Sequence, residues 1–258
     1  MSFATIEVAA DGAAGALTLN RPEKLNPLST QTLRELADAA RWFDERPEVK
    51  VVVVSGAGRA FSAGADVSVF TGGEPGVAER REGADAGRRM AEAIESMRAV
   101  TIAAIRGHCV GGAVVLAGAC DLRLAAQGTR FSIHEVDLGI PLAWGGIPRL
   151  VREIGPAMTK ELVMSCRPFS AEEARELGFD NRVLPDEQLD AAVEQLAGEL
   201  VRKSAFTLAA TKSAVNAAAA ELISGANAWN DADSLLTALA DPESRRCAQE
   251  YLQRISRR

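Results

Sequence analysis

Two short stretches rich in glycine and alanine, 62–66 (SAGAD) and 110–114 (VGGAV), could do chemistry through their backbone amides. Each follows an apolar run that predicts a β-strand, and the second opens a segment of small residues that predicts a helix. Amides at a helix N-terminus have no partner within the helix and carry a partial positive charge. Two such amides pointing at one carbonyl oxygen would form an oxyanion hole, in which each is worth about 3 kcal/mol. The glycines could instead only allow tight turns and close packing, and the spacing alone leaves both interpretations open.

The composition is that of an ordinary globular protein. Of the 258 residues, 47% are hydrophobic and 25% are charged, and the net charge of −6 argues against nucleic acid as the main partner. No run approaches the roughly 18 apolar residues of a membrane span, and the N-terminal segment lacks the pattern of a secretion signal. We therefore expect a cytoplasmic protein with neither a membrane nor a nucleic-acid partner.

The cysteines and histidines do not predict a metal site. The four cysteines show no CxxC spacing, and His108 and His134 are far apart in the sequence. We interpret the cysteines as reduced thiols in or near the core. His108 lies where a strand gives way to a helix, so a structural hydrogen bond is the expected use for it, and His134 is assigned no role.

Strand patterns alternate with helix patterns in the first half of the chain. The expected strands are 4–9, 15–20, 49–55 and 100–106, with two further strand-like pieces in 120–133. A helix is expected after Ser29 or Thr30 as its N-cap, and it should end before Pro47. Residues 72–86, rich in glycine and acids, predict a mobile excursion ahead of a helix at 87–97.

From Gly145 onward the pattern is helical only. Strands with connecting helices, followed by helices alone, predict an α/β core with a helical C-terminal part. We place the core domain at 1–200 and the helical region at 201–258.

Five stretches fall in the order and at the spacings of the crotonase, or enoyl-CoA hydratase/isomerase, family, which the chain resembles over nearly its whole length. They are RPEKLNPLS, VVVVSGAGRAFSAGADV, IAAIRGHCVGGAVVLAGACDLRLAA, RFSIHEVDLGIPLAWGGIPRLVREIG and FSAEEARELGFDNRV. The resemblance implies a spiral of ββα units that forms two packed sheets, and C-terminal helices that close the site and trimerise, often into a dimer of trimers. It also implies an acyl-CoA or enoyl-CoA thioester substrate, with coenzyme A as part of the substrate and no separate cofactor.

By position, the resemblance assigns the two oxyanion amides to Ala65 and Gly112. Arg59 is a candidate contact for a CoA phosphate, because arginine and phosphate pair in fork geometry. Trp144 is expected to line the acyl pocket, with a plain core role as the alternative. The remaining CoA contacts are assigned to Lys24, Leu25, Ala63, Asp66, Val67, Tyr251 and Arg254, the last two reaching toward the CoA of a neighbouring subunit. A solvated basic C-terminus is the alternative for Arg254.

The family's hydratases resemble one another in carrying two glutamates. This sequence matches the one in the later loop with Glu135, but the position three residues after the oxyanion glycine is Val115, which cannot transfer a proton. Losing one positioned acid or base typically lowers a rate by about 10² to 10⁴. Hydration needs an activated water and a protonated carbon, whereas moving a double bond needs one base.

We therefore expect a single-base enzyme, with Glu135 shifting a 3-enoyl-CoA to its 2-enoyl isomer in preference to hydration. One alternative is an enoyl-CoA hydratase of fatty-acid degradation that uses Asp137 in place of the missing acid. Another is a non-catalytic acyl-CoA-binding protein that kept the pocket and lost turnover. A serine hydrolase would need Ser62 and His134 together, and nothing in the sequence brings them together.

Overall fold

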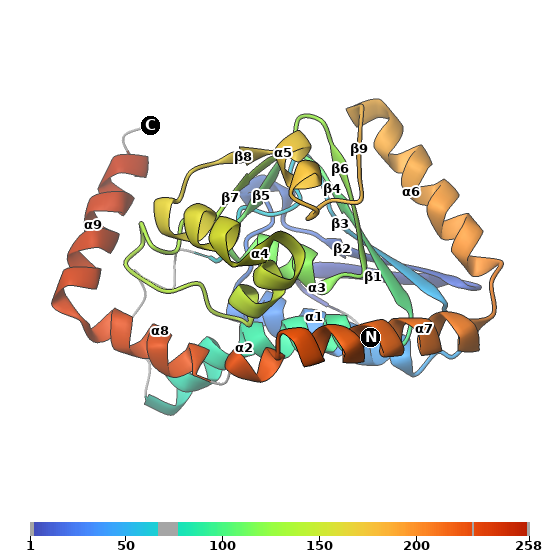
Figure 1. Cartoon of the computed structure of the whole chain (residues 1–258), viewed down its shortest axis with the longest axis horizontal. Helices are drawn as coiled ribbons and strands as arrows, with labels where there is room; N and C mark the ends of the chain where they lie inside the picture. The colour runs from blue at the N-terminus through green and yellow to red at the C-terminus, as the bar shows by residue number, and fades with distance from the viewer. Residues whose placement is uncertain (1–2, 67–76, 229, 257–258) are drawn as a thin grey trace.

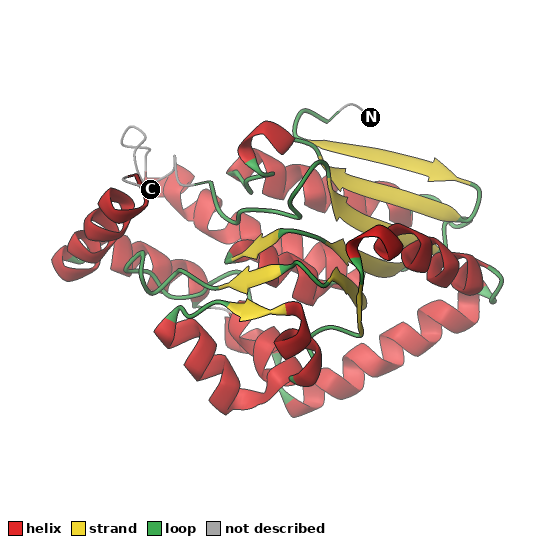
Figure 2. Ribbon diagram, turned by 90° about the horizontal axis from the view of Figure 1, so that it is seen from above, coloured by secondary structure: helices red, strands yellow, loops and turns green. Residues whose placement is uncertain are grey.

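The computed structural model describes residues 3–66, 77–228 and 230–256, and it combines two β-sheets with helices around them (Figures 1 and 2). The larger sheet has six strands in the order β1-β2-β3-β4-β6-β9, and the smaller has three in the order β5-β7-β8. The strands are β1 (Ile6–Asp11), β2 (Ala14–Leu19), β3 (Val51–Gly56), β4 (Val100–Ile105), β5 (His108–Val110), β6 (Leu122–Ala126), β7 (Arg130–Ser132), β8 (Phe169–Ser170) and β9 (Arg182–Leu184). The helices are α1 (Thr30–Asp44), α2 (Val77–Ser96), α3 (Gly112–Ala119), α4 (Gly146–Ser165), α5 (Ala171–Glu176), α6 (Asp186–Val201), α7 (Ala205–Leu222), α8 (Asp231–Ala240) and α9 (Pro242–Ser256). This is the α/β class, with a helical C-terminal part, that the sequence predicts.

The central strands of the larger sheet are buried on both faces. Alternate residues of a strand point to opposite faces. On one face Val51 and Ile102 pack with Leu189 of α6. On the other, Val52 and Ala103 belong to the main core with α1, α2 and α3. Burial on both faces explains the unbroken apolar runs in these strands.

The parallel part of this sheet places two loops at the same edge. The hairpin β1–β2 is antiparallel, and β2, β3, β4, β6 and β9 run parallel to one another. Ser55 of β3 stands opposite Ala104 of β4. The chain therefore leaves β3 and β4 at neighbouring points of the carboxyl edge, where α/β sheets place their binding sites.

The helix α1 forms as its sequence predicts. Its N-cap is Ser29, whose hydroxyl accepts a hydrogen bond from the Thr32 amide at 3.2 Å. Leu33, Leu36 and Phe43 recur at helical spacing and are buried. The helix ends at Asp44, shortly before Pro47, as expected.

Helix α2 begins earlier than the sequence suggested. Residues 77–86 are helical and not a mobile excursion, which corrects that expectation, while 72–76 lie outside the described residues. Ala84, Ala86 and Met90 form the buried side of this helix. Small apolar residues among acids and glycines give a weak periodic signal, so the pattern concealed the helix.

The second half of the chain is not helical only. The short strands β8 and β9 follow α4 and complete the edges of the two sheets. Strands of two or three residues are too short to show an alternating pattern, so they could not be read from the sequence. The expected domain boundary at residue 200 falls at the end of α6, and that division stays a prediction.

Helices α7, α8 and α9 run beside the core and then away from it (Figure 1). Helix α8 packs on α2, and Arg81 and Asp233 form an ion pair between them. Among the residues that the structure describes, no helix is both long enough and apolar enough to cross a membrane.

Asp180 is a carboxylic acid buried in the core. Its exposed fraction is 3%, and within the described residues neither side-chain oxygen has a hydrogen-bond partner. Burial raises the pKa of Asp180 to about 7, and the nearby Arg123 charge offsets part of that effect. The folded protein holds this proton up to about pH 7, whereas the unfolded chain releases it near 3.8. The free energy of unfolding therefore falls as the pH rises between those values.

We expect Asp180→Asn to stabilise the protein at pH 8 more than at pH 5. Removing a buried charge of this kind is worth on the order of a few kcal/mol, which corresponds to a rise in Tm of about 5 °C or more. Thermal unfolding followed by circular dichroism at both pH values measures the effect. Asp11→Asn, at an exposed strand end, is the matched control and should change Tm by only about 1 °C at either pH. A Tm of Asp180→Asn at pH 8 equal to or below that of the wild type would contradict the prediction.

Candidate active site

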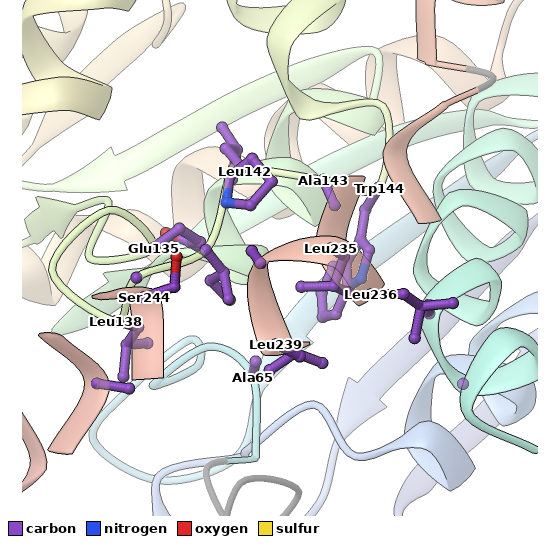
Figure 3. A pocket seen from close by; sticks show the side chains of 18 of the residues that line it. Ala65, Glu135, Leu138, Leu142, Ala143, Trp144, Leu235, Leu236, Leu239 and Ser244 are labelled. Carbon is purple, nitrogen blue, oxygen red and sulfur yellow. The ribbon is translucent and has the colours of Figure 1, made fainter. Parts of the chain in front are cut away.

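A cavity of about 660 Å³ lies between the carboxyl edge of the larger sheet and the helices α8 and α9. Ala65, Gly112 and Glu135, which the sequence assigned to catalysis, all line it. Asp66 and Trp144 line it as well. Figure 3 shows Glu135, Ala65 and Trp144 around the same space, although Ala65 follows β3 and the other two lie in the connection between β7 and α4.

Backbone pairing holds the two glycine-rich stretches side by side. Ser62 and Cys109 form a parallel bridge, in which the Ser62 amide donates to the His108 carbonyl at 2.9 Å and the Val110 amide donates to the Ser62 carbonyl at 3.1 Å. Gly64 has a φ of +87°, and a Cβ there would collide with the Val110 carbonyl. Only glycine allows this close approach. The turns after β3 and β5 therefore meet.

The amides of Ala65 and Gly112 are available to a ligand. The bridge between Leu28 and Ala65 uses the Gly64 carbonyl and the Asp66 amide, so the Ala65 amide points away from Leu28. Gly112 is the first residue of α3, and its amide has no carbonyl within the helix to bond. Within the described residues neither amide donates a hydrogen bond. Two free donors on one cavity wall can hold an anionic oxygen.

The start of α3 also fits closely against two side chains of the cavity. Gly111 has a φ of +54°, and a Cβ on it would stand 2.5 Å from Oε1 of Glu135. A Cβ on Gly112 would collide with the Trp144 ring. The absence of side chains at these two glycines thus brings the Glu135 carboxyl against the turn that carries the Gly112 amide.

Glu135 is the buried acid of the cavity. Its exposed fraction is 8%, and within the described residues its Oε2 has no hydrogen-bond partner. Burial raises the pKa of Glu135 to about 7, and the backbone amides of His134 and of Glu135 itself offset part of that effect. A carboxyl group that is half ionised near neutral pH is suited to take a proton and to return it.

Val115 offers no second acid to the cavity. It is buried, with 2% exposed, and its Cγ2 lies so close behind Gly146 that a Cβ on Gly146 would come within 2.7 Å of it. Among the described residues, Glu135 and Asp66 are the carboxyl groups that line the cavity. Asp66 forms an ion pair with Arg21, with 3.4 Å between Nη1 and Oδ2.

Tyr251 and Arg254 contact the loop that carries Glu135. The ring centroids of Tyr251 and His134 are 5.6 Å apart, and Arg254 forms an ion pair with Asp137 at 3.2 Å. Asp137, the expected substitute acid, is therefore engaged with a cation and does not line the cavity. The assignment of Tyr251 and Arg254 to the CoA of a neighbouring subunit stays a prediction.

Four predicted CoA contacts lie outside the cavity wall. Leu25 and Ala63 are adjacent, because the Ala63 amide donates to the Leu25 carbonyl at 2.8 Å, and Lys24 precedes them in a short 3₁₀ turn. Arg59 is exposed in the loop after β3. None of the four lines the cavity, and their roles stay predictions. Val67 lies outside the described residues.

The sequence analysis missed the part of the cavity wall that comes from α8 and α2. Leu235, Leu236 and Leu239 of α8, and Gly83 and Ala84 of α2, all line the cavity. The apolar side of α8 recurs at helical spacing, which is the signal that could have been used. That signal predicts burial against a partner, but it does not distinguish a core from a ligand cavity.

Comparison with known proteins shows the family. The sequence profile described as enoyl-CoA hydratase/isomerase matches residues 10–255. A crotonyl-CoA hydratase of Syntrophomonas wolfei is 34% identical, over 84% of this chain and 83% of its own. A peroxisomal Delta(3,5)-Delta(2,4)-dienoyl-CoA isomerase of Arabidopsis thaliana is 35% identical, over 82% of this chain and 81% of its own. The crystal structure of an enoyl-CoA hydratase from Mycobacterium avium subsp. paratuberculosis has a TM-score of 0.88 and 27% identity, covering 96% of this chain and 99% of that one.

The chain therefore belongs to the enoyl-CoA hydratase/isomerase, or crotonase, family, and the resemblance read from the sequence is confirmed. The α/β spiral fold expected from that resemblance is confirmed as well. The profile and the relatives together support an enzyme of this family that acts on enoyl-CoA thioesters.

We expect the carboxyl group of Glu135 to titrate with a midpoint near pH 7 in the free protein. Carbon NMR of protein labelled at the glutamate carboxyl measures this, and the signal is assigned by its loss in Glu135→Gln. Because burial causes the shift, Asp137→Asn should leave the midpoint almost unchanged. A midpoint below pH 5, or a midpoint that moves by a full unit in Asp137→Asn, would contradict this explanation.

Proposed function

We propose that this chain is an enoyl-CoA isomerase that moves the double bond of a 3-enoyl-CoA thioester to the 2-position. The observation that carries the proposal is the single buried carboxyl of Glu135 in the cavity that Ala65 and Gly112 also line. By the family resemblance, Val115 takes the position of the hydratases' second glutamate. The similarity to a named dienoyl-CoA isomerase supports the same class of reaction.

The proposed reaction uses one base twice. The Glu135 carboxylate takes a proton from C2 of the substrate, and the electron pair moves onto the thioester oxygen to give a dienolate. The amides of Ala65 and Gly112 stabilise that oxygen, each by about 3 kcal/mol. Glu135 then returns the proton to C4, the double bond forms between C2 and C3, and the carboxylate is regenerated. The CoA thioester is the substrate, and the sequence of steps needs no separate cofactor.

Hydration is the competing function, because other relatives, such as the Syntrophomonas wolfei protein, are named hydratases. Hydration requires a second proton-transfer group beside the bound water. Asp137 is the nearest sequence candidate, and its ion pair with Arg254 draws it away from that use. The apolar surroundings of Val115 offer no substitute.

We expect Glu135→Gln to lower the rate of 3-enoyl-CoA isomerisation by at least about 10² to 10⁴, because an amide cannot accept the proton. Binding of a saturated acyl-CoA should change only about threefold. The assay compares isomerisation of 3-hexenoyl-CoA with hydration of crotonyl-CoA in the wild type, Glu135→Gln and Asp137→Asn.

Three outcomes of that assay would count against the proposal. Fast hydration that survives Glu135→Gln would show that the single-base mechanism is wrong. Hydration that is lost in Asp137→Asn would instead support a hydratase with a substitute acid. Tight binding of acyl-CoA without either turnover would identify a binding protein.

We also propose that the chain assembles as a homotrimer or as a dimer of trimers. Helix α7 has no buried residue in the single chain, and Phe206, Val215 and Leu222 on it are more than half exposed. Large apolar side chains that stay exposed on a helix with no buried residue are typical of contact surfaces. Buried thiols at Cys109 and Cys120 suit the reducing cytoplasm that the sequence predicts.

Light scattering coupled to size-exclusion chromatography should therefore give a mass three or six times the chain's 27.3 kDa. Phe206→Asp should shift the population toward smaller species, because it places a charge in the contact. A wild-type mass equal to one chain at micromolar concentration would rule out this assembly.

A further inference from the structure

The wall of the cavity opposite Glu135 is aliphatic. Leu235 and Leu236 of α8 lie across the view from Glu135, and Leu239 lies lower, next to Ala65 (Figure 3). Helix α2 faces α8 across this region and contributes Gly83, which has no side chain to fill the space. The cavity thus continues beyond the reacting position between two helices.

The size of the cavity exceeds what a short acyl group needs. A methylene group takes up about as much space as a water molecule in the liquid, roughly 30 Å³. If the thioester and the pantetheine arm take about half of the 660 Å³, the remaining half holds a chain of roughly ten carbon atoms. A four-carbon acyl group would leave most of that half unfilled.

Two arginine side chains stand on the cavity wall, and Arg34 lies near Gly83 because its ion-pair partner is Glu82. Arg34 and Arg245 line the cavity, and both are exposed, so they border its opening to solvent. Arg34 also lies 3.8 Å from the Glu82 carboxylate. Leu235, Leu236 and Leu239 carry no charge and no hydrogen-bonding group in their side chains, so this part of the wall favours an aliphatic chain.

We propose that the acyl group of the substrate is an aliphatic chain of about eight to twelve carbons, whose far end lies between Leu235 and Leu236 of α8 and Gly83 of α2. This inference depends on the proposed function in one respect only, namely that the ligand is a CoA thioester. Gly83 makes the space: a Cβ there would meet a single neighbouring atom within 4 Å, the Thr30 hydroxyl at 3.7 Å. A larger side chain at Gly83 therefore fits the backbone and shortens the cavity.

The test measures binding and needs no turnover. Isothermal titration calorimetry with butyryl-CoA and decanoyl-CoA gives the ratio of their two affinities for the wild type. Each buried methylene strengthens binding by up to about fourfold, so decanoyl-CoA should bind at least about 100-fold more tightly than butyryl-CoA. Gly83→Leu should reduce this ratio at least about tenfold.

Gly198→Leu is the matched control for the substitution. Gly198 also lies within a helix, α6, and a Cβ there would meet only an Arg202 side-chain nitrogen at 3.9 Å, away from the cavity. This variant should keep the wild-type ratio. Leu236→Ser on α8 is a second cavity variant, and it should lower the ratio in the same direction as Gly83→Leu.

The inference is overturned if the wild type binds butyryl-CoA and decanoyl-CoA within about threefold of each other, a result that does not depend on any variant folding. It is also overturned if Gly83→Leu weakens both ligands equally. If only the proposed function is wrong, the protein will still bind decanoyl-CoA much more tightly than butyryl-CoA, but it will not isomerise 3-enoyl-CoA.

Discussion

The site depends on how the segment 62–65 is held in place. Its backbone pairs with one stretch of chain near Leu28 and with another near Cys109. On one side the Leu28 amide donates to the Gly64 carbonyl at 2.8 Å, and on the other Ser62 pairs with Cys109. A side chain at Gly64 would break the second contact. The stretch is poor in side chains because its backbone lies against neighbouring backbone, and this pairing leaves unused the amide of Ala65, a residue of the cavity wall.

Patterns within one element predicted what that element does. The Ser29 cap, the strands buried on both faces and the two glycine turns were found in this way, whereas Glu135 was assigned only through the resemblance to the family. What escaped prediction depends on contacts between distant segments. The leucines of α8 look like an ordinary buried helix face, and β8 and β9 exist only because neighbouring strands pair with them. Nothing local separates a leucine that lines a ligand cavity from one that fills a core.

Val115 has apolar surroundings, and burial raises the pKa of Glu135. Val115 packs behind Gly146, and Leu142 lies beside it, so this side of the site is apolar. A low-polarity environment disfavours the ionised carboxyl and brings its pKa close to neutral. A proton taken from carbon must be given back to carbon, and a base near neutral pKa does both steps with similar ease. The valine and the single base therefore fit one chemistry.

Asp180 shows why a raised pKa alone does not identify a catalytic acid. Burial moves the pKa of Asp180 and of Glu135 in the same direction and to a similar value. Asp180 does not line the cavity, and its surroundings are the packed core beside Arg123. Glu135 differs because free amides and an open cavity adjoin it, so a ligand can reach its proton. A buried carboxylate lowers stability in either place, and the proposed function would give the protein a use for the one at Glu135, which lines the cavity.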